Sequence, residues 1–416
     1  MRKYFWADGD ISLRIINKKD VNDIYKSLRD TKFRMDIDHG VILPANMNKA
    51  EEIINDAIAS TKEGEEIYFS ILNNEGIMVG YTLLSWIDER LGILDCNVFI
   101  FSEYRRRGYG TTAYNIMLDY VFNERRIHKV HCCTIDGNNE GPAFLYKFGF
   151  KFEAKRSEMF YSHGKYLSEY YYGLTEDEYR NNKLCNRSFK DCPKDFITKI
   201  PYSTLGEIKN SHNNKEEFEA YEDRKYFWDY GDISVRATTI EDYMINEEMI
   251  KDSKICRFYD DDVKLPMAID EESVNEKLGS HLNFKCEDGR LEFSITDKDG
   301  NYIGNVSLCG LDYKNGKFSL SIYMVPECRG KGYGTKALRL IVSYAFFELR
   351  MNKLITNVND GNEASATMMR KVGCKVEGVR RECAYYTGKY VDVVFFGITK
   401  KEFAEFNKGK GVVPFN

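Results

Sequence analysis

The chain has 416 residues, which suits two domains of ordinary size, and its 43% hydrophobic and 30% charged residues are typical of a globular protein. The net charge of −5 lacks the basic excess of a nucleic-acid-binding protein, and no stretch approaches the roughly 20 apolar residues of a membrane helix. The start has no secretory signal and the 11 cysteines show no CxxC pair, so we expect free thiols in a reducing, cytoplasmic compartment.

The first half of the chain predicts a mixed α/β sheet. Residues 67–72 are typical of a hairpin strand that closes through a turn at 73–76. A short apolar strand at 98–101 follows, and then a basic loop with two glycines and a helix. The next strand, 129–135, should lie parallel to the strand at 98–101, because a helix connects the two.

The segment after the second parallel strand predicts another helix. Asp136-Gly137-Asn138 offers N-cap side chains, Pro142 suits a first turn, and Gly149 is a common stop. The aromatic run Tyr170 to Tyr172 alternates as a strand does. We interpret it as core and sheet surface rather than as a platform for stacking.

The second half of the chain repeats the first. The segment Lys3 to Trp6 returns as Lys225 to Trp228, and residues 127–179 match 351–403 with 17 identities in 53 positions. Each copy has the size of a whole domain. A polar, charged segment between the copies is typical of a linker. The predicted domains are 1–179 and 225–408, with the linker at 180–224.

The second copy predicts the same elements in the same order. They are a hairpin strand with its turn, an apolar strand, a helix, a parallel strand, and a capped helix with a glycine stop. We place them at 291–296, 297–300, 322–325, 337–345, 353–358 and 360–373.

A basic, glycine-rich loop joins strand to helix in both copies. Glycines let the main chain approach a ligand closely, and the following helix offers unpaired N–H groups and a positive dipole end. With the basic side chains, these features predict a diphosphate site in each copy. The expected ligands are Arg105, Arg106, Arg107, Gly108, Tyr109, Gly110 and Thr111, and Arg329, Gly330, Lys331, Gly332, Tyr333, Gly334 and Thr335.

Two other interpretations of this loop stay open. A solvated basic turn that caps a helix would look similar in one copy, although its recurrence in both copies favours a ligand. The spacing Gly108-x-Gly110-x-x-Ala113 also fits a dinucleotide-binding fingerprint. That fold places its loop after the first strand of the domain, whereas several strands precede it here.

Taken together, the motifs resemble those of the GNAT acetyltransferases. Arg-x-x-Gly-x-Gly after a strand is similar to motif A of that family, and Asn362-x-x-Ser365 is similar to the motif that follows. Glu377-Gly378 with Arg380, and then Gly388 to Asp392, resembles the C-terminal signature of the ribosomal-protein N-acetyltransferase branch. The resemblance covers all of the chain except the linker.

The resemblance implies a mostly antiparallel sheet whose two central parallel strands splay apart. It also implies acetyl-CoA as the acyl donor, with its pantetheine arm hydrogen-bonded to the first of those strands. No zinc-type spacing occurs, so we expect no metal. The implied strand contacts are Phe99, Ile100 and Phe101, and Tyr323, Met324 and Val325; Asn138 and Asn362 should lie near the pantetheine end.

Transfer to an amine needs the neutral amine, so a base helps. The position that carries a carboxylate in many family members is Asp95 in the first copy and Ser319 in the second. The hydroxyl that related enzymes use is Ser365 in the second copy, where the first has Gly141-Pro142. We therefore expect Asp95 and Ser365 to be catalytic. The alternatives are an exposed strand carboxylate and a helix-capping or packing serine.

These observations predict an acetyl-CoA-dependent N-acetyltransferase that acts on a protein N-terminus or a small-molecule amine. Alternatively, one domain is a degenerate CoA-binding or scaffolding module that supports the other as an intramolecular pseudo-dimer. We expect no nucleic-acid or membrane partner. The regions expected to choose the acceptor are 32–48, 254–270, 162–164 and 387–388. Acidic side chains in the two longer regions either attract a cationic amine or form solvated loops.

Overall fold

A computed structural model describes residues 4–38, 43–138, 140–182, 192–193, 196, 227–250, 290–386 and 388–414. The chain forms two compact units that divide near residue 200. They are called domain one and domain two below. Most of the predicted linker and the whole acceptor-choosing region 254–270 lie outside the described residues, as do Thr387 and residues 39–42.

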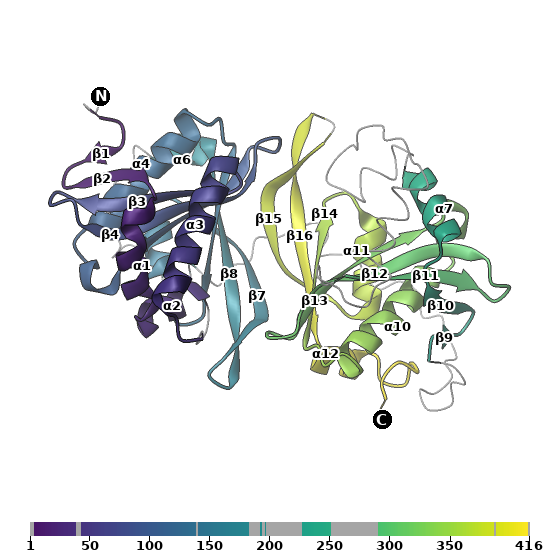
Figure 1. Ribbon diagram of the computed structural model, residues 1–416. Helices are drawn as coiled ribbons and strands as arrows, with labels where there is room; N and C mark the ends of the chain where they lie inside the picture. The colour runs from purple at the N-terminus through teal and green to yellow at the C-terminus, as the bar shows by residue number, and fades with distance from the viewer. Residues whose placement is uncertain are drawn as a thin grey trace. The chain divides into compact units, whose positions relative to one another are not determined.

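Domain one is built on a mixed sheet (Figure 1), and the strand order is β1-β2-β3-β4-β5-β6-β8-β7. Strands β1 to β5 pair antiparallel, β5 and β6 are parallel, and β6 and β8 are again antiparallel. The predicted hairpin and parallel pair are therefore confirmed. The strands are β1 Ala7–Asp8, β2 Ile11–Ile15, β3 Ile67–Asn73, β4 Met78–Asp88, β5 Ile93–Ile100, β6 Lys129–Ile135, β7 Lys151–Ser162 and β8 Lys165–Thr175.

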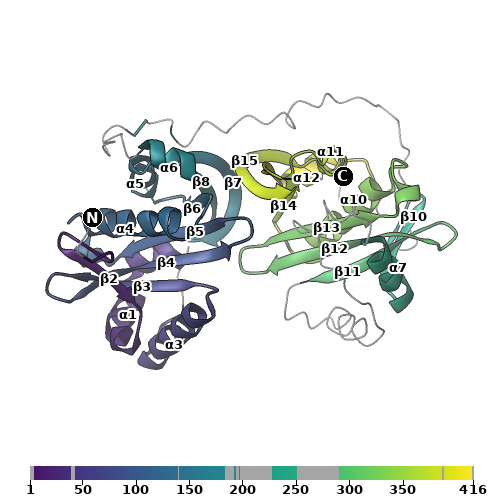
Figure 2. The ribbon, with the colours of Figure 1, turned by 90° about the horizontal axis from the view of Figure 1, so that it is seen from above.

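Helices cover both faces of this sheet (Figure 2). One face carries α1 Val21–Leu28, α2 Thr31–Asp38 and α3 Met47–Glu63, and the other carries α4 Tyr109–Asn123, α5 Gly141–Lys147 and α6 Glu176–Asn182. Each side has its own apolar core. Ala113, Met117 and Val121 recur every four residues along α4 and are fully buried, as their helical spacing predicts. Pro142 lies in the first turn of α5, also as predicted.

Domain two repeats the sheet in the order β9-β10-β11-β12-β13-β14-β16-β15, with β13 and β14 as the parallel pair. Its strands are β9 Asp229–Tyr230, β10 Ile233–Ala237, β11 Leu291–Asp297, β12 Tyr302–Asp312, β13 Lys317–Met324, β14 Lys353–Asn359, β15 Lys375–Tyr386 and β16 Lys389–Thr399. Its helices are α7 Ile240–Ile250, α10 Tyr333–Phe347, α11 Glu363–Val372 and α12 Lys400–Phe406. Helix α11 ends at Gly373, whose φ is +106°, as the sequence predicts.

Each sheet buries a lysine–glutamate pair. Lys129 on β6 donates to both carboxylate oxygens of Glu153 on β7, at 2.9 and 3.1 Å, and both side chains are fully buried. Lys353 and Glu377 form the same pair in domain two. A glycine makes room for each carboxylate, because a Cβ at Gly173 would lie 2.5 Å from a Glu153 oxygen. Gly397 fills this role in domain two.

An arginine–aspartate pair fixes the first helix of each domain to the sheet. The guanidinium of Arg14 donates to the buried Asp20 carboxylate at 2.5 and 2.9 Å, and Ser70 Oγ donates to it at 2.8 Å. The corresponding residues of domain two are Arg236, Asp242 and Ser294. Burial alone would raise the pKa of Asp20, but these hydrogen bonds and the Asn17 amide hold that pKa below its ordinary value.

Because of this pair, we expect domain one to be sensitive to acid. The pKa of Asp20 is lower in the folded protein than in the unfolded one, so its ionised carboxylate stabilises the fold above the ordinary aspartate pKa of about 3.9. This contribution is lost as the pH falls through the folded-state pKa. We expect Asp20→Asn to lower the free energy of unfolding by about 2 kcal/mol at pH 7. It should also weaken the pH dependence below about pH 4, measured by urea unfolding. The control is Asp23→Asn, which removes only an exposed pair with Lys26. Equal losses in the two variants would contradict the assignment.

Candidate functional site

The parallel strands of domain one part after three rungs. The ladder between β5 and β6 runs from Ile93–Lys129 to Asp95–His131 and stops there. Strand β5 nevertheless continues to Ile100 and β6 to Ile135. The splay that the sequence resemblance implies is therefore confirmed, and it leaves main-chain groups of residues 96–100 without ladder partners on β6.

Domain two splays in the same way. Its parallel ladder consists of Lys317–Lys353 and Phe318–Leu354, whereas β13 runs on to Met324 and β14 to Asn359. In both domains the strand edge that faces the splay is a surface to which an extended, amide-containing ligand can hydrogen-bond. The predicted pantetheine contacts, Phe99 to Phe101 and Tyr323 to Val325, lie at the open end of this edge.

Side chains close the apex of the splay in domain one. The Cys96 carbonyl lies just past the last rung and accepts hydrogen bonds from Tyr114 Oη at 3.0 Å and Cys132 Sγ at 2.8 Å. Burial raises the pKa of the Cys96 thiol well above its ordinary value, so this thiol is not reactive. The eight cysteines of the described residues are free thiols, as predicted.

The glycine-rich loop connects the splayed strand to a helix N-terminus. A short 3₁₀ turn, Ser102–Tyr104 or Pro326–Cys328, is followed by the loop and then by α4 or α10. Gly108 and Gly332 are the N-cap residues, with φ of +86° and +89°. The first-turn N–H groups of each helix have no acceptor within the helix, so they point at the position where an anion is stabilised.

A second glycine lets each helix pack against the splayed strand. A Cβ at Gly110 would lie 3.3 Å from Ile100 Cγ1, and one at Gly334 would lie 3.4 Å from Met324 Cγ. The first arginine of each loop braces the strand end, since Arg105 Nε donates to the Ile100 carbonyl and Arg329 Nε to that of Met324, both at 3.0 Å.

The two loops differ at one strained position. Arg106 has φ of +66°, and its guanidinium forms an exposed ion pair with Glu140 at 2.7 Å. Domain two has Gly330 there, with φ of +75°. The backbone needs a left-handed conformation at this position in both domains, and only domain two provides a residue that adopts it without strain.

The predicted asparagines both accept a hydrogen bond at the start of a helix, but only Asn362 is an N-cap residue. Asn362 Oδ1 accepts from the Ser365 amide at 3.2 Å, whereas Asn138 Oδ1 accepts from the Gly141 amide at 2.9 Å and Glu140 is the N-cap residue of α5. Ser365 is half-buried in the first turn of α11. Asp95 is half-buried on β5, between Ser85 and the buried His131 on neighbouring strands. The two predicted catalytic residues thus belong to different domains: Asp95 lies at the last rung of the parallel ladder of domain one, and Ser365 lies in the helix that follows β14 of domain two.

One candidate functional residue could not be identified from the sequence. The six histidines are dispersed along the chain and suggest no cluster. His131 becomes noticeable only when β5 and β6 are set in register, which puts it beside Asp95. The aromatic run of domain one, by contrast, lies in the sheet as predicted, and its Tyr172 is buried. The matching Phe395 and Phe396 of domain two are buried as well.

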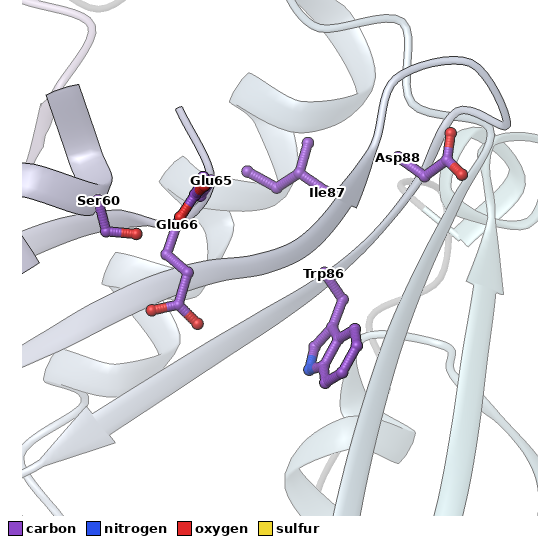
Figure 3. A pocket seen from close by; sticks show the side chains of 6 residues that line it. All are labelled: Ser60, Glu65, Glu66, Trp86, Ile87 and Asp88. Carbon is purple, nitrogen blue, oxygen red and sulfur yellow. The ribbon is translucent and has the colours of Figure 1, made fainter. Parts of the chain in front are cut away.

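An open hollow of about 570 Å³ lies at the ends of α3 and β4 in domain one (Figure 3). Trp86 is 83% exposed, and its indole points away from Ile87. The hollow lies on elements other than the glycine loop. Its lining residues are Ser60, Glu65, Glu66, Trp86, Ile87 and Asp88.

Among the described residues no helix is long and apolar enough to cross a membrane, and no group of acidic, His or Cys side chains is placed to hold a metal.

The strain at the loop predicts unequal effects of two alanine substitutions. Gly330→Ala should lower the free energy of unfolding by about 1 kcal/mol, because a Cβ there has open space but an unfavourable φ. Arg106→Ala keeps a non-glycine residue and loses only an exposed ion pair, so we expect a change below about 0.5 kcal/mol. Urea unfolding of both variants measures the difference, and an unchanged Gly330→Ala variant would refute the role of backbone strain.

Comparison with known proteins places both halves in one family. The family model described as "Acetyltransferase (GNAT) domain" matches residues 10–151 and 233–375. An uncharacterized N-acetyltransferase, YokL, from an SPbeta prophage of Bacillus subtilis is 29% identical over 185 residues, which are 44% of this chain and 98% of YokL. The putative ribosomal N-acetyltransferase YdaF of the same organism is 35% identical over 104 residues, 25% of this chain and 57% of YdaF.

Two further proteins to which the chain is similar are named for spermidine. Spermidine N(1)-acetyltransferase of Escherichia coli K12 is 28% identical over 117 residues, which are 28% of this chain and 63% of that enzyme. The crystal structure of spermidine N-acetyltransferase from Vibrio cholerae with CoA and spermine aligns with a TM-score of 0.37 and 21% identity. The alignment covers 41% of this chain and 98% of that one.

Proposed function

Because the chain belongs to the GNAT acetyltransferase family and carries two domains of it, we propose that it moves the acetyl group of acetyl-CoA directly to a primary amine of a protein N-terminus or a small molecule. The observation that carries this proposal is the pairing, in each domain, of a splayed parallel strand with a glycine-capped helix N-terminus. Relatives that are named for ribosomal and spermidine substrates favour an amine acceptor.

The residues present fit the parts of an acyl-CoA. The first-turn amides of α4 and α10, with the basic side chains of each loop, suit a diphosphate. The open edges of β5 and β13 suit the amides of a pantetheine arm. A main-chain N–H on such an edge is also a suitable donor to the thioester oxygen as negative charge develops there. The thiol of CoA is a fair leaving group, with an ordinary pKa of about 8.5 for a thiol.

The roles of Asp95 and Ser365 follow from their places. Asp95 lies at the apex of the splay, next to the position that the thioester would take, so it suits the role of base in domain one. Ser365 follows Asn362 at the start of α11, so its hydroxyl suits an acid or a proton relay in domain two. Neither domain has both groups, since Ser319 and Gly141 stand at the corresponding positions.

The loop glycines provide the test of the main proposal. Thiol release from acetyl-CoA should be stimulated by at least one member of a panel of peptides, polyamines and other small amines. We expect Gly110→Asp and Gly334→Asp each to abolish CoA binding in its own domain, because a carboxylate at a helix N-terminus opposes a diphosphate. Gly110→Ala is the matched control, which adds a Cβ without a charge. The absence of both turnover and calorimetric CoA binding in the wild type would refute the proposal.

A second candidate function is that one domain only binds or supports. It is favoured by the incomplete catalytic sets described above. Calorimetric titration with CoA decides between the two, because a degenerate domain predicts one equivalent per chain and two working domains predict two. If two equivalents bind, and each is removed by one of the aspartate variants, neither domain has lost its CoA site.

A further inference from the structure

A row of four residues crosses the sheet of domain one where its parallel strands part. Ser85 on β4 is paired with Asp95, Asp95 with His131 on β6, and His131 with Gly173 on β8. Neighbouring strands lie about 4.8 Å apart, so Asp95 and His131 are immediate neighbours. Theirs is the last rung of the parallel ladder.

Asp95 and His131 project to the face of the sheet opposite α4. Alternate residues of β5 and β6 enter the core under α4, and strand side chains alternate between faces. His131 is 3% exposed, whereas Asp95 is half-buried, so the carboxylate is the more accessible of the two. The residues of these strands that enter the core under α4 are Leu94, Cys96, Val130 and Cys132.

Domain two lacks this pair of groups. Ser319 and Ile355 replace Asp95 and His131, and the ladder there ends one rung earlier. Ser319 Oγ donates to the Cys309 carbonyl at 3.2 Å. Neither a serine nor an isoleucine takes up a proton at neutral pH, so the two domains differ in whether this row can accept one.

A carboxylate alone is a poor base for an amine at neutral pH. Its ordinary pKa is about 3.9, while a base works best with a pKa near the pH of the reaction. An imidazole titrates near 6.5, and a neighbouring carboxylate raises that value. Burial of His131 lowers its pKa and the adjacent carboxylate raises it, so the pair takes up a proton at a higher pH than a lone aspartate or a serine does.

We propose that His131 is a positioning residue that acts through Asp95, and that this pair makes domain one the half of the chain in which side chains take the proton from the acceptor. The inference rests on the proposed function. Asp95 accepts one proton from the ammonium group, and His131 takes it over as imidazolium. The neutral amine attacks the thioester carbonyl carbon, a C–N bond forms, the C–S bond breaks, and the thiolate takes the second amine proton. The imidazolium releases its proton to water.

Other charged or titratable side chains share this face of the sheet. Lys129 is two residues before His131, and its ion pair with Glu153 is neutral overall. Burial first, and then the charges of Glu169 and Asp95, raise the pKa of the Cys133 thiol, so that group stays protonated. Glu169 accepts a hydrogen bond from Tyr171 Oη at 2.8 Å and is paired with Ile135, so Asp95 is the carboxylate directly opposite His131. The groups on this face are Tyr68 on β3, Tyr81 on β4, Asp95 on β5, Lys129 and Cys133 on β6, Glu153 on β7, and Glu169 and Tyr171 on β8.

The first test needs no turnover. In the full chain labelled at histidine, NMR titration gives the pKa of each imidazole, and His131→Ile identifies the resonance of His131. We expect Asp95→Asn to lower the pKa of His131 by about one unit, a tenfold change in proton affinity, because it removes the negative charge. Asp88→Asn is the matched control, with the same charge change at the end of β4. An unchanged pKa in Asp95→Asn would overturn the inference whatever the activity.

The second test measures kcat/KM against pH in a Gly334→Asp background, so that turnover reports domain one. We expect an acidic limb near neutrality. His131→Ile should move that limb to lower pH and reduce the plateau about tenfold or more, because aspartate alone then serves as a weaker base. His131→Gln keeps a hydrogen-bonding side chain without titration, so it should move the limb in the same way. In a protein that already carries Asp95→Ser, adding His131→Ile should cause no further change in kcat/KM.

The outcomes separate this inference from the proposed function. If no amine is acetylated by the wild type, the proposed function fails. If turnover occurs but His131→Ile lowers the rate without moving the limb, His131 has only a packing role and the inference fails. Additive effects of His131→Ile and Asp95→Ser would overturn it as well, since residues that act as one unit are not additive. Calorimetry with CoA checks that the donor site is intact in each variant.

Discussion

The central parallel strands of each domain stay together over two or three rungs and then separate. Parallel ladders are normally continuous, so each separation leaves main-chain polar groups that need other partners. At the apex in domain one, a tyrosine and a cysteine satisfy the first such carbonyl, and at the open end an arginine satisfies the last. Only the middle of the strand edge keeps main-chain groups for a ligand. That middle is the part of the edge on which the proposed thioester binding depends.

A buried ion pair anchors the second parallel strand of each domain to the strands on its other side. Lys129 and Lys353 are the first residues of the second parallel strand and occupy the first rung of each ladder. Removing one partner of a buried pair leaves an uncompensated charge and typically costs several kcal/mol, so the place of this strand in the sheet is strongly specified. The strands can therefore part a few residues later without the sheet coming apart.

Much of the fold could be predicted from the sequence because its signals are local. Two glycines before a helix, an asparagine cap and alternating apolar residues each specify a neighbourhood of a few residues, and the duplication presented each signal twice. His131 could not be found in this way, because its meaning depends on the register between β5 and β6, which lie more than thirty residues apart. Arg106 also gave no sign of its left-handed backbone, which is visible only beside Gly330.

The glycine under each ion pair has an evolutionary consequence. The lysine, glutamate and glycine at these three positions depend on one another. A side chain on the glycine would displace the carboxylate, and loss of either charged group would leave the other buried without its partner. A change to an apolar trio would be tolerable only if it happened at all three positions together. Single substitutions therefore pass through unstable proteins. Asp95 and His131 differ from Ser319 and Ile355 of the second copy, while this trio is the same in both copies.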